Sequence, residues 1–87
     1  MSRPMPLLYV MRVPEFEPLA EAARAGGAEV REAGDYFEVT SAGPSLVIER
    51  AAHSPIRPAI WFAALAGGYL GRVARFDGTR LEIEDDR

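Results

Sequence analysis

The stretch LAGGYLGRVARFDGTRLEIE, from Leu65 to Glu84, decides how this chain folds. It places Gly67-Gly68 at the end of an apolar run and continues as a segment in which apolar and polar residues alternate. The pair Asp77-Gly78 interrupts this alternation, and such a pair between alternating segments is typical of a β-hairpin. The stretch therefore predicts a helix that ends at two glycines and a hairpin that closes the fold.

The register of this hairpin stays open, because two loop lengths fit the sequence. A two-residue turn puts one set of side chains on the same face: Ala74, Phe76, Leu81 and Ile83. A three-residue loop groups a different set: Val73, Arg75, Leu81 and Ile83. Leu81 and Ile83 face inward in both cases, so they are the residues of the hairpin that we expect in the core.

Four further strands are predicted upstream of this stretch. Apolar or alternating segments bounded by turn residues indicate strands over 7–11, 28–32, 36–40 and 46–48. The turns at Gly34-Asp35 and Ala42-Gly43-Pro44 are short. We therefore expect the last three of these strands to form an antiparallel meander.

Two helices complete the predicted order. Pro14 and Gly26-Gly27 mark the two ends of the first helix, and Pro58 opens a second helix with its body over 59–66. The order β-α-β-β-β-α-β-β predicts an α+β fold in which two helices pack on a mostly antiparallel sheet. A chain of 87 residues forms one domain, residues 1–87, and its sequence shows no internal repeat.

The second helix is apolar on all sides between residues 59 and 66. A surface helix normally has one polar face. Two explanations remain open: the helix is plain core, or part of Ile60, Trp61 or Phe62 stays exposed for a partner. Tyr36, Tyr69 and Trp61 would be natural interface anchors, because large amphipathic side chains are enriched in binding hot spots.

The glycines at 67, 68 and 71 do not predict a phosphate loop. Such a loop follows a strand and opens a helix, whose N-terminus holds the anion. Here the helix comes first, so the glycines lie at a helix C-terminus, where exposed carbonyl groups repel anions. The interpretation that remains is a joint between a helix and a strand.

Candidate catalytic and metal-binding groups are sparse. The chain has no cysteine and one histidine, His53, which we expect in a solvated loop. Its neighbour Ser54 is expected to cap the second helix or to lie in a plain loop. The acidic end is expected to be a solvated strand edge and tail: Glu82, Glu84, Asp85 and Asp86. We therefore predict no catalytic residue, no metal and no cofactor.

Composition limits the partners. The net charge of −3 and a pI near 5.1 argue against nucleic acid, because nucleic-acid-binding domains carry a basic face. The longest uncharged run, 58–71, is shorter than a membrane span, and the N-terminus does not resemble a signal peptide. These features predict a cytoplasmic protein without a membrane partner, a monomer or weak dimer.

Three stretches in this order resemble the regulatory (effector or coupling) proteins of soluble di-iron multicomponent monooxygenases, the methane, phenol, toluene and alkene monooxygenase systems. They are FEPLAEAARAGGAEVREAGDYFEVTSAG, LVIER and LAGGYLGRVARFDGTRLEIE. Tyr36 lies at a frequent aromatic position of that family. Gly71-Arg72-Val73 is similar to its Gly-basic-aliphatic step, and the resemblance spans about 13–84. Gly67-Gly68-Tyr69 is an addition before that step.

The resemblance implies a non-catalytic, cofactor-free component that binds the hydroxylase over its di-iron site and tunes oxygen activation, substrate access and coupling. The candidate hydroxylase interface is Tyr36, Trp61, Tyr69 and Arg72. Two other hypotheses stay open. The chain could be a generic α+β interaction module or accessory subunit, or a small dimeric ferredoxin-like enzyme that uses residues such as Tyr36, His53 and Arg57.

Overall fold

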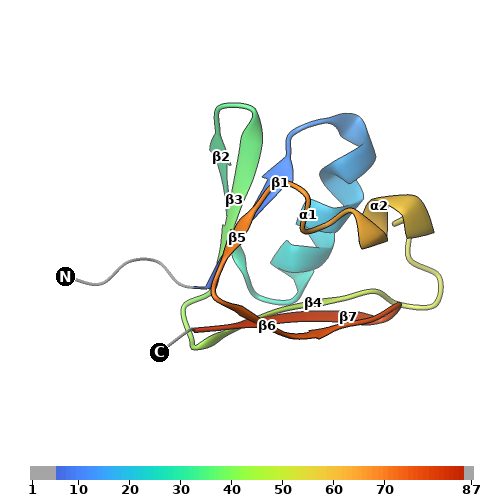
Figure 1. Cartoon of the computed structure of the whole chain (residues 1–87). Helices are drawn as coiled ribbons and strands as arrows, with labels where there is room; N and C mark the ends of the chain where they lie inside the picture. Colours follow the sequence, from blue (N-terminus) through green and yellow to red (C-terminus); the bar gives the residue numbers. More distant parts are fainter. Residues whose placement is uncertain (1–5, 86–87) are drawn as a thin grey trace.

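The computed structural model describes residues 6–85 and has the predicted α+β class (Figure 1). The two helices are α1 (Glu17–Ala25) and α2 (Pro58–Phe62), and a short 3-10 turn, η1 (Pro14–Phe16), leads into α1. The strands are β1 (Leu7–Met11), β2 (Glu29–Ala33), β3 (Tyr36–Thr40), β4 (Ser45–Glu49), β5 (Tyr69–Leu70), β6 (Arg72–Phe76) and β7 (Arg80–Glu84). Every pairing between strands is antiparallel.

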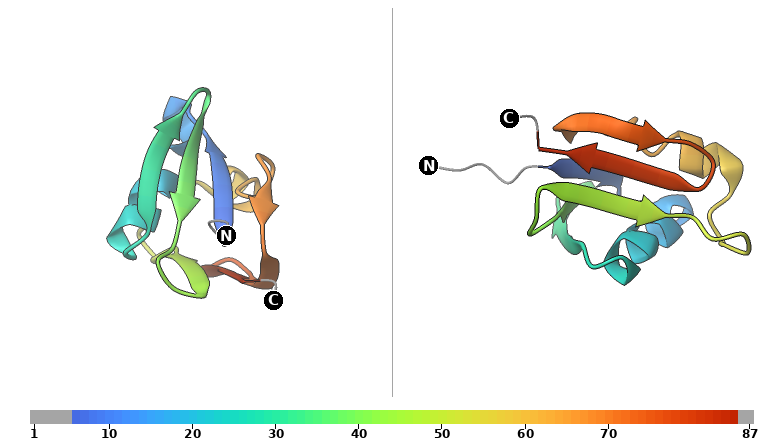
Figure 2. Two further views of the ribbon diagram at one scale, coloured as in Figure 1. Left: turned by 90° about the vertical axis from the view of Figure 1, so that its left-hand side faces the viewer. Right: turned by 90° about the horizontal axis from the view of Figure 1, so that it is seen from below.

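The strands form two sheets rather than one. The first sheet has the order β2-β3-β1-β5 and the second has the order β4-β7-β6. The sheets are inclined to each other, and both helices lie beside the space between them (Figures 1 and 2). The predicted meander is therefore wrong at its third strand, because β4 leaves β3 and pairs with β7. This pairing brings Leu46 and Ile48 opposite Ile83 and Leu81, and all four side chains are buried.

The two sheets come from two βαββ units with the same topology. In the first unit, β1-α1-β2-β3, the first strand pairs with the last and the last pairs with the middle strand. In the second unit, β4-α2-β6-β7, the same pairings occur, and β5 is an added strand that extends the first sheet beside β1. The structure thus contains an internal repeat of topology that no repeat of residues predicted.

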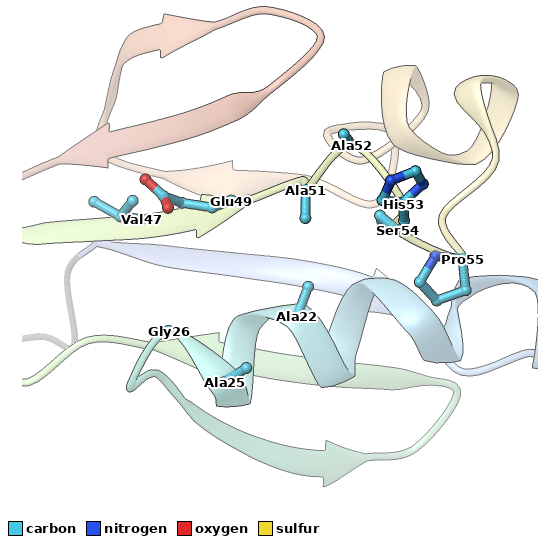
Figure 3. Close-up of a pocket in the computed structure, with 10 residues that line it drawn as sticks. All are labelled: Ala22, Ala25, Gly26, Val47, Glu49, Ala51, Ala52, His53, Ser54 and Pro55. Atoms are coloured by element: carbon cyan, nitrogen blue, oxygen red, sulfur yellow. The ribbon is translucent and has the colours of Figure 1, made fainter.

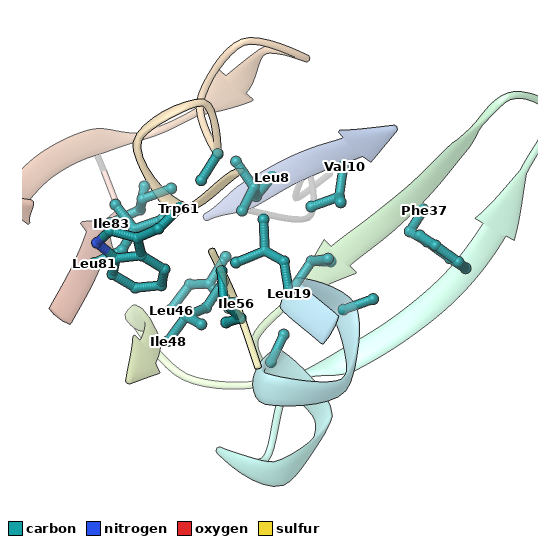
Figure 4. Close-up of a cluster of buried hydrophobic side chains, with 14 residues drawn as sticks. Leu8, Val10, Leu19, Phe37, Leu46, Ile48, Ile56, Trp61, Leu81 and Ile83 are labelled. Carbon is teal, nitrogen blue, oxygen red and sulfur yellow. The ribbon is translucent and has the colours of Figure 1, made fainter. Parts of the chain in front are cut away.

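The core lies between the two sheets and α1 (Figure 4). Leu8 and Val10 come from one sheet, Leu81 and Ile83 from the other, and Leu19 from the helix, and each is at most 1% exposed. Burying one such side chain contributes about 1.5–3 kcal/mol. Packing of the two sheets against α1 therefore accounts for much of the stability of this small domain.

The second helix is shorter than predicted. α2 ends at Phe62, and the chain continues through tight turns, because the N–H groups of Ala63 and Ala64 donate to Ile60 O and Trp61 O, three residues earlier, at 3.1 Å. Trp61 is 0% exposed, whereas Phe62 is 57% exposed. Trp61 is therefore core, as the first explanation predicts, and Phe62 faces outward; a partner for Phe62 stays a prediction.

A β-bulge settles the register of the closing hairpin. Phe76 lies opposite Leu81, so these two share a face as in the two-residue turn, and Val73 lies opposite Ile83, so these two share a face as in the three-residue loop. The shift falls between Val73 and Arg75, where one extra residue enters β6 and reverses the alternation. Neither simple register is therefore right, and the inner face of the hairpin combines Val73 and Phe76 with Leu81 and Ile83.

Asp77 organises the turn of this hairpin. Its Oδ1 accepts hydrogen bonds from the N–H groups of Thr79 and Arg80, at 2.9 and 3.0 Å, and from the Thr79 hydroxyl. Its Oδ2 lies 2.7 Å from Nε of Arg75. The bond from the Thr79 amide, followed by the one from Arg75, holds the pKa of the Asp77 carboxyl well below its usual range. The backbone carbonyl of Asp77 accepts a hydrogen bond from Trp61 Nε1 at 2.6 Å, and this bond links the turn to the core.

The lowered pKa of Asp77 predicts a pH-dependent difference between the wild type and Asp77→Asn. The folded-state pKa lies below the unfolded value of about 3.9, so the ionised carboxylate stabilises the fold above that pH and the contribution is lost as pH falls. We expect Asp77→Asn to be less stable at pH 7, with a difference that shrinks below about pH 4. Urea unfolding followed by the fluorescence of the single tryptophan measures this, and a constant difference down to pH 2 would contradict it.

Candidate protein-interaction surface

The two βαββ units allow their outer faces to be compared position by position. The pairs β1–β3 and β4–β7 have the same five-residue register, so Met11–Tyr36 corresponds to Glu49–Arg80. The inward positions are apolar in both units. The outward positions differ, because the second sheet carries ion pairs that include Glu49–Arg80 at 2.7 Å and Arg72–Glu84. The outer face of the second sheet therefore carries an ion pair at the positions where the first sheet has Met11 and Tyr36, and the ion pair of the first sheet, Arg31–Glu38, lies beside those two residues.

The outer face of the first sheet carries what we name the aromatic strip: Tyr9, Met11, Tyr36 and Leu70. Met11, Tyr36 and Leu70 are 41%, 38% and 40% exposed. The rings of Tyr9 and Tyr36 meet edge to face with their centroids 6.0 Å apart. Leu70 pairs with Leu7, two residues before Tyr9, and so extends the strip onto β5. Exposed apolar side chains grouped in this way mark interaction surfaces.

Gly67 and Gly68 lie directly beside the aromatic strip and pack against its two tyrosines. Tyr9 N–H donates to Gly68 O at 2.9 Å, which holds the joint against β1. A Cβ atom on Gly67 would lie 2.5 Å from Tyr9 O and 3.3 Å from a ring carbon of Tyr36, so no larger residue fits there. Gly68 has φ 102°, a left-handed conformation that favours glycine. The predicted joint is wrong on its helix side, because α2 already ends at Phe62 and tight turns follow; Gly67-Gly68 join those turns to β5 and border the aromatic strip.

The structure places the four predicted interface residues in different surroundings. Tyr36 lies on the aromatic strip. Tyr69 precedes Leu70 on the edge strand β5 and is 41% exposed, although its strand partner Leu8 is buried. Arg72 lies on β6 in an ion pair with Glu84. Trp61 has no exposed surface, so its assignment to an interface is wrong, because its ring fills the core.

Sequence reasoning missed Tyr9, Met11 and Leu70. Tyr9 and Met11 lie in the apolar run LLYVM, which was predicted as a strand, and Leu70 lies in β5, a strand that was not predicted. The alternation of side chains along β1 was the available signal, because Leu8 and Val10 point inward and Tyr9 and Met11 then point to the opposite face. Among residues 6–85, no helix or sheet covers that side (Figure 2), and this turns the outward positions into an exposed surface.

The residues proposed for an enzyme do not converge. His53 lines a groove beside α1 with Ala22, on the connector between β4 and α2 (Figure 3). Tyr36 lies beside Tyr9 on the outer sheet face, and Arg57 is the exposed residue that precedes α2. Within residues 6–85, no three His, Cys, Asp or Glu side chains gather as a metal site would require.

The structure decides between the two predictions made for Ser54. Ser54 does not cap α2: its Oγ accepts a hydrogen bond from the N–H of Ile56 at 3.1 Å, and the helix begins at Pro58 without a side-chain cap. Of the two alternatives for Ser54, the plain loop residue is therefore the one observed.

At the acidic end, Glu82 and Glu84 lie on β7 in ion pairs with Arg80 and Arg72, and Asp86 lies outside the described residues. Among residues 6–85, no helix has the length and hydrophobicity of a membrane span.

Comparisons with protein-family models, with curated proteins and with solved structures find no match to this chain. Its function is therefore argued from its own sequence and surface.

Proposed function

We propose that this chain is a cofactor-free regulatory component of a soluble di-iron monooxygenase and acts by binding the hydroxylase. The observation that carries the proposal is the aromatic strip, which occupies the face where the second βαββ unit has a charged ladder of ion pairs. Exposed apolar side chains that lie together, as Met11 and Tyr36 do, mark surfaces that a partner covers. The resemblance of three ordered stretches to the regulatory proteins supports the hydroxylase as that partner.

In this proposal the strip supplies the apolar centre of the interface. Tyr36 and Tyr9 provide large, rigid rings with a polar tip, the composition that interface hot spots favour. Arg31 and Glu38, paired at 2.7 Å on the same outer face, and Arg72 beyond β5 form a polar rim. The net charge of −3 would speed docking onto a basic hydroxylase surface in the cytoplasm.

Regulation then follows from differential affinity. A protein without a cofactor can change the hydroxylase only by binding one of its conformations better than another. A coupling free energy of about 1–3 kcal/mol, which is typical, changes the ratio of the two states about 5- to 150-fold. This range is enough to alter oxygen activation, substrate access and the coupling of electron use to hydroxylation.

Reconstitution tests the proposed function. Purified hydroxylase and reductase from the same organism are assayed with and without this chain, and product formation and reductant consumption are both measured. We expect added chain to raise product formed per reductant consumed, with saturation near equimolar hydroxylase sites. Unchanged rate, coupling and regioselectivity at all concentrations would rule the proposal out. Capture of an unrelated partner through the same strip would favour the generic interaction module instead.

A further inference from the structure

Strand β2 ends the first sheet, on the side opposite β5 (Figure 1). Three of its five residues, Glu29, Arg31 and Glu32, are exposed, whereas the side chain of Val30 packs against the core. The inner face of β2 is therefore covered, and its edge is open. An open strand edge is a template for pairing with a strand of another chain.

The backbone groups of β2 point alternately toward β3 and toward this open edge. A two-residue turn joins β2 to β3, so the residues that flank the turn, Ala33 and Tyr36, form a hydrogen-bonded pair. Such pairs recur at every second residue, so the N–H and C=O groups of Val30 and Glu32 point away from β3. In the part of the chain that the structure describes, nothing takes these four groups.

The charges beside this edge are only partly paired. Glu29 has no ion pair within residues 6–85, and its neighbour on β3 is the neutral Thr40. Arg31 contacts Glu38 at 2.7 Å through one guanidinium nitrogen, and its side chain is 71% exposed. An arginine has five N–H donors, so a second carboxylate can pair with Arg31 from the open side of β2. The edge thus carries a carboxylate that lacks a cation and, two residues away, a cation with donors to spare.

We propose that two copies of this chain associate through their β2 edges, as a two-fold symmetric antiparallel pair that joins the two first sheets into one. An axis at Val30 sets Glu29 of each copy opposite Arg31 of the other. An axis at any of the three charged residues sets that residue opposite its own copy, which is unfavourable. Ala33 adjoins the turn, so an axis there leaves almost no strand to pair. The charges therefore select the register centred on Val30.

This register also satisfies the open backbone groups. Val30 would exchange two hydrogen bonds with Val30 of the other copy, because its N–H and C=O both point to the edge. The Glu32 N–H would donate to Ala28 O of the other copy. The small side chain of Ala28 leaves room for the Glu32 carboxylate and its partner Arg12. The axis is perpendicular to the sheet, so the aromatic strips of the two copies would lie on one outer face.

Self-association of the full chain is the first test. A five-residue edge buries less than a standard interface, so we expect a dissociation constant of about 100 µM. Sedimentation velocity should show a dimer that grows between about 10 µM and about 1 mM. Amide hydrogen exchange at Val30 and Glu32 should slow about fivefold over this range. A chain that is monomeric at 1 mM, or one whose association slows exchange elsewhere but not at Val30, would overturn the proposal.

Charge variants test the register. Glu29→Arg sets two arginines against each other on each side of the axis, and Arg31→Glu sets two glutamates there. Each variant alone should weaken the dimer about tenfold or more. An equimolar mixture of the two restores opposite charges on both sides of the axis. It should associate within about threefold of the wild type, which would also show that both variants are folded.

The matched control is Glu15→Arg, which makes the same charge change on η1, outside the first sheet. We expect this control to stay within about twofold of the wild type. Equal weakening by Glu15→Arg and Glu29→Arg, or a mixture that associates no better than its components, would overturn the proposal. None of these outcomes depends on the hydroxylase.

Discussion

Gly71→Ala is expected to destabilise the fold by about 3–5 kcal/mol, the largest stability effect that we predict for a one-methyl change. Gly71 has φ 119°, a conformation that alanine adopts only with strain. Its Cβ would also lie 2.6 Å from Glu84 O and 2.9 Å from Cγ2 of Ile83. Neither group can move freely, because β7 pairs with both of its neighbours. Gly71 is the residue where the chain passes from the first sheet to the second.

Urea unfolding followed by tryptophan fluorescence measures this effect, since the single tryptophan is fully buried. The control is Gly43→Ala, because an added Cβ at Gly43 meets nothing within 4 Å. We expect Gly43→Ala to remain within about 0.5 kcal/mol of the wild type. A Gly71→Ala protein within 1 kcal/mol of the wild type would mean that the joint between the sheets is not as tightly packed as described.

The second large effect is expected for the double variant Met11→Glu, Tyr36→Arg. These substitutions install, on the first sheet, the ion pair that Glu49 and Arg80 form at the equivalent positions of the second. The cross-strand pair suits an antiparallel ladder, so the free energy of unfolding should change by at most about 1 kcal/mol. Affinity for the hydroxylase should fall about 100-fold, equivalent to about 2.7 kcal/mol, because an apolar hot spot is replaced by charge.

Direct binding measurements with purified hydroxylase check this prediction. The matched control is Arg80→Gln, which removes the ion pairs of Arg80 with Glu49 and Glu82 on the second sheet and leaves the aromatic strip intact. We expect this control to bind within about twofold of the wild type. Equal losses for the control and the double variant would place the interface elsewhere than the strip.

The elements were largely predictable because their signals are local. The strands at 7–11 and 36–40 have the predicted bounds, and the first helix stops at the two glycines, where Gly27 has φ 97°. The partner of β4 was not predictable, because the apolar side chains of Leu46 and Ile48 can pack beside those of any apolar strand. The bulge in β6 was not predictable either. A hairpin without a bulge places either Val73 or Phe76 on the inner face, and only a bulge places both there.

The candidate surface was predictable only in part. Tyr36 stood out as a large amphipathic residue in an alternating strand, and it lies on the aromatic strip. Trp61 has the same chemistry but is buried, because the closing hairpin covers it and accepts its N–H. Tyr9 and Met11 lie in an unbroken apolar run, so alternation along the strand gives their direction but not their exposure. Their exposure depends on which sheet face the helices leave open, and this is a property of the assembled fold.

The most direct test of the central claim is the product formed per reductant consumed by hydroxylase and reductase during titration with this chain. We expect a saturable change with the wild-type chain and the same curve with Arg80→Gln. We expect the double variant Met11→Glu, Tyr36→Arg to need about 100-fold more protein for the same change. A titration in which the wild-type chain leaves rate and coupling unchanged, or in which the double variant acts as well as the wild type, would contradict it.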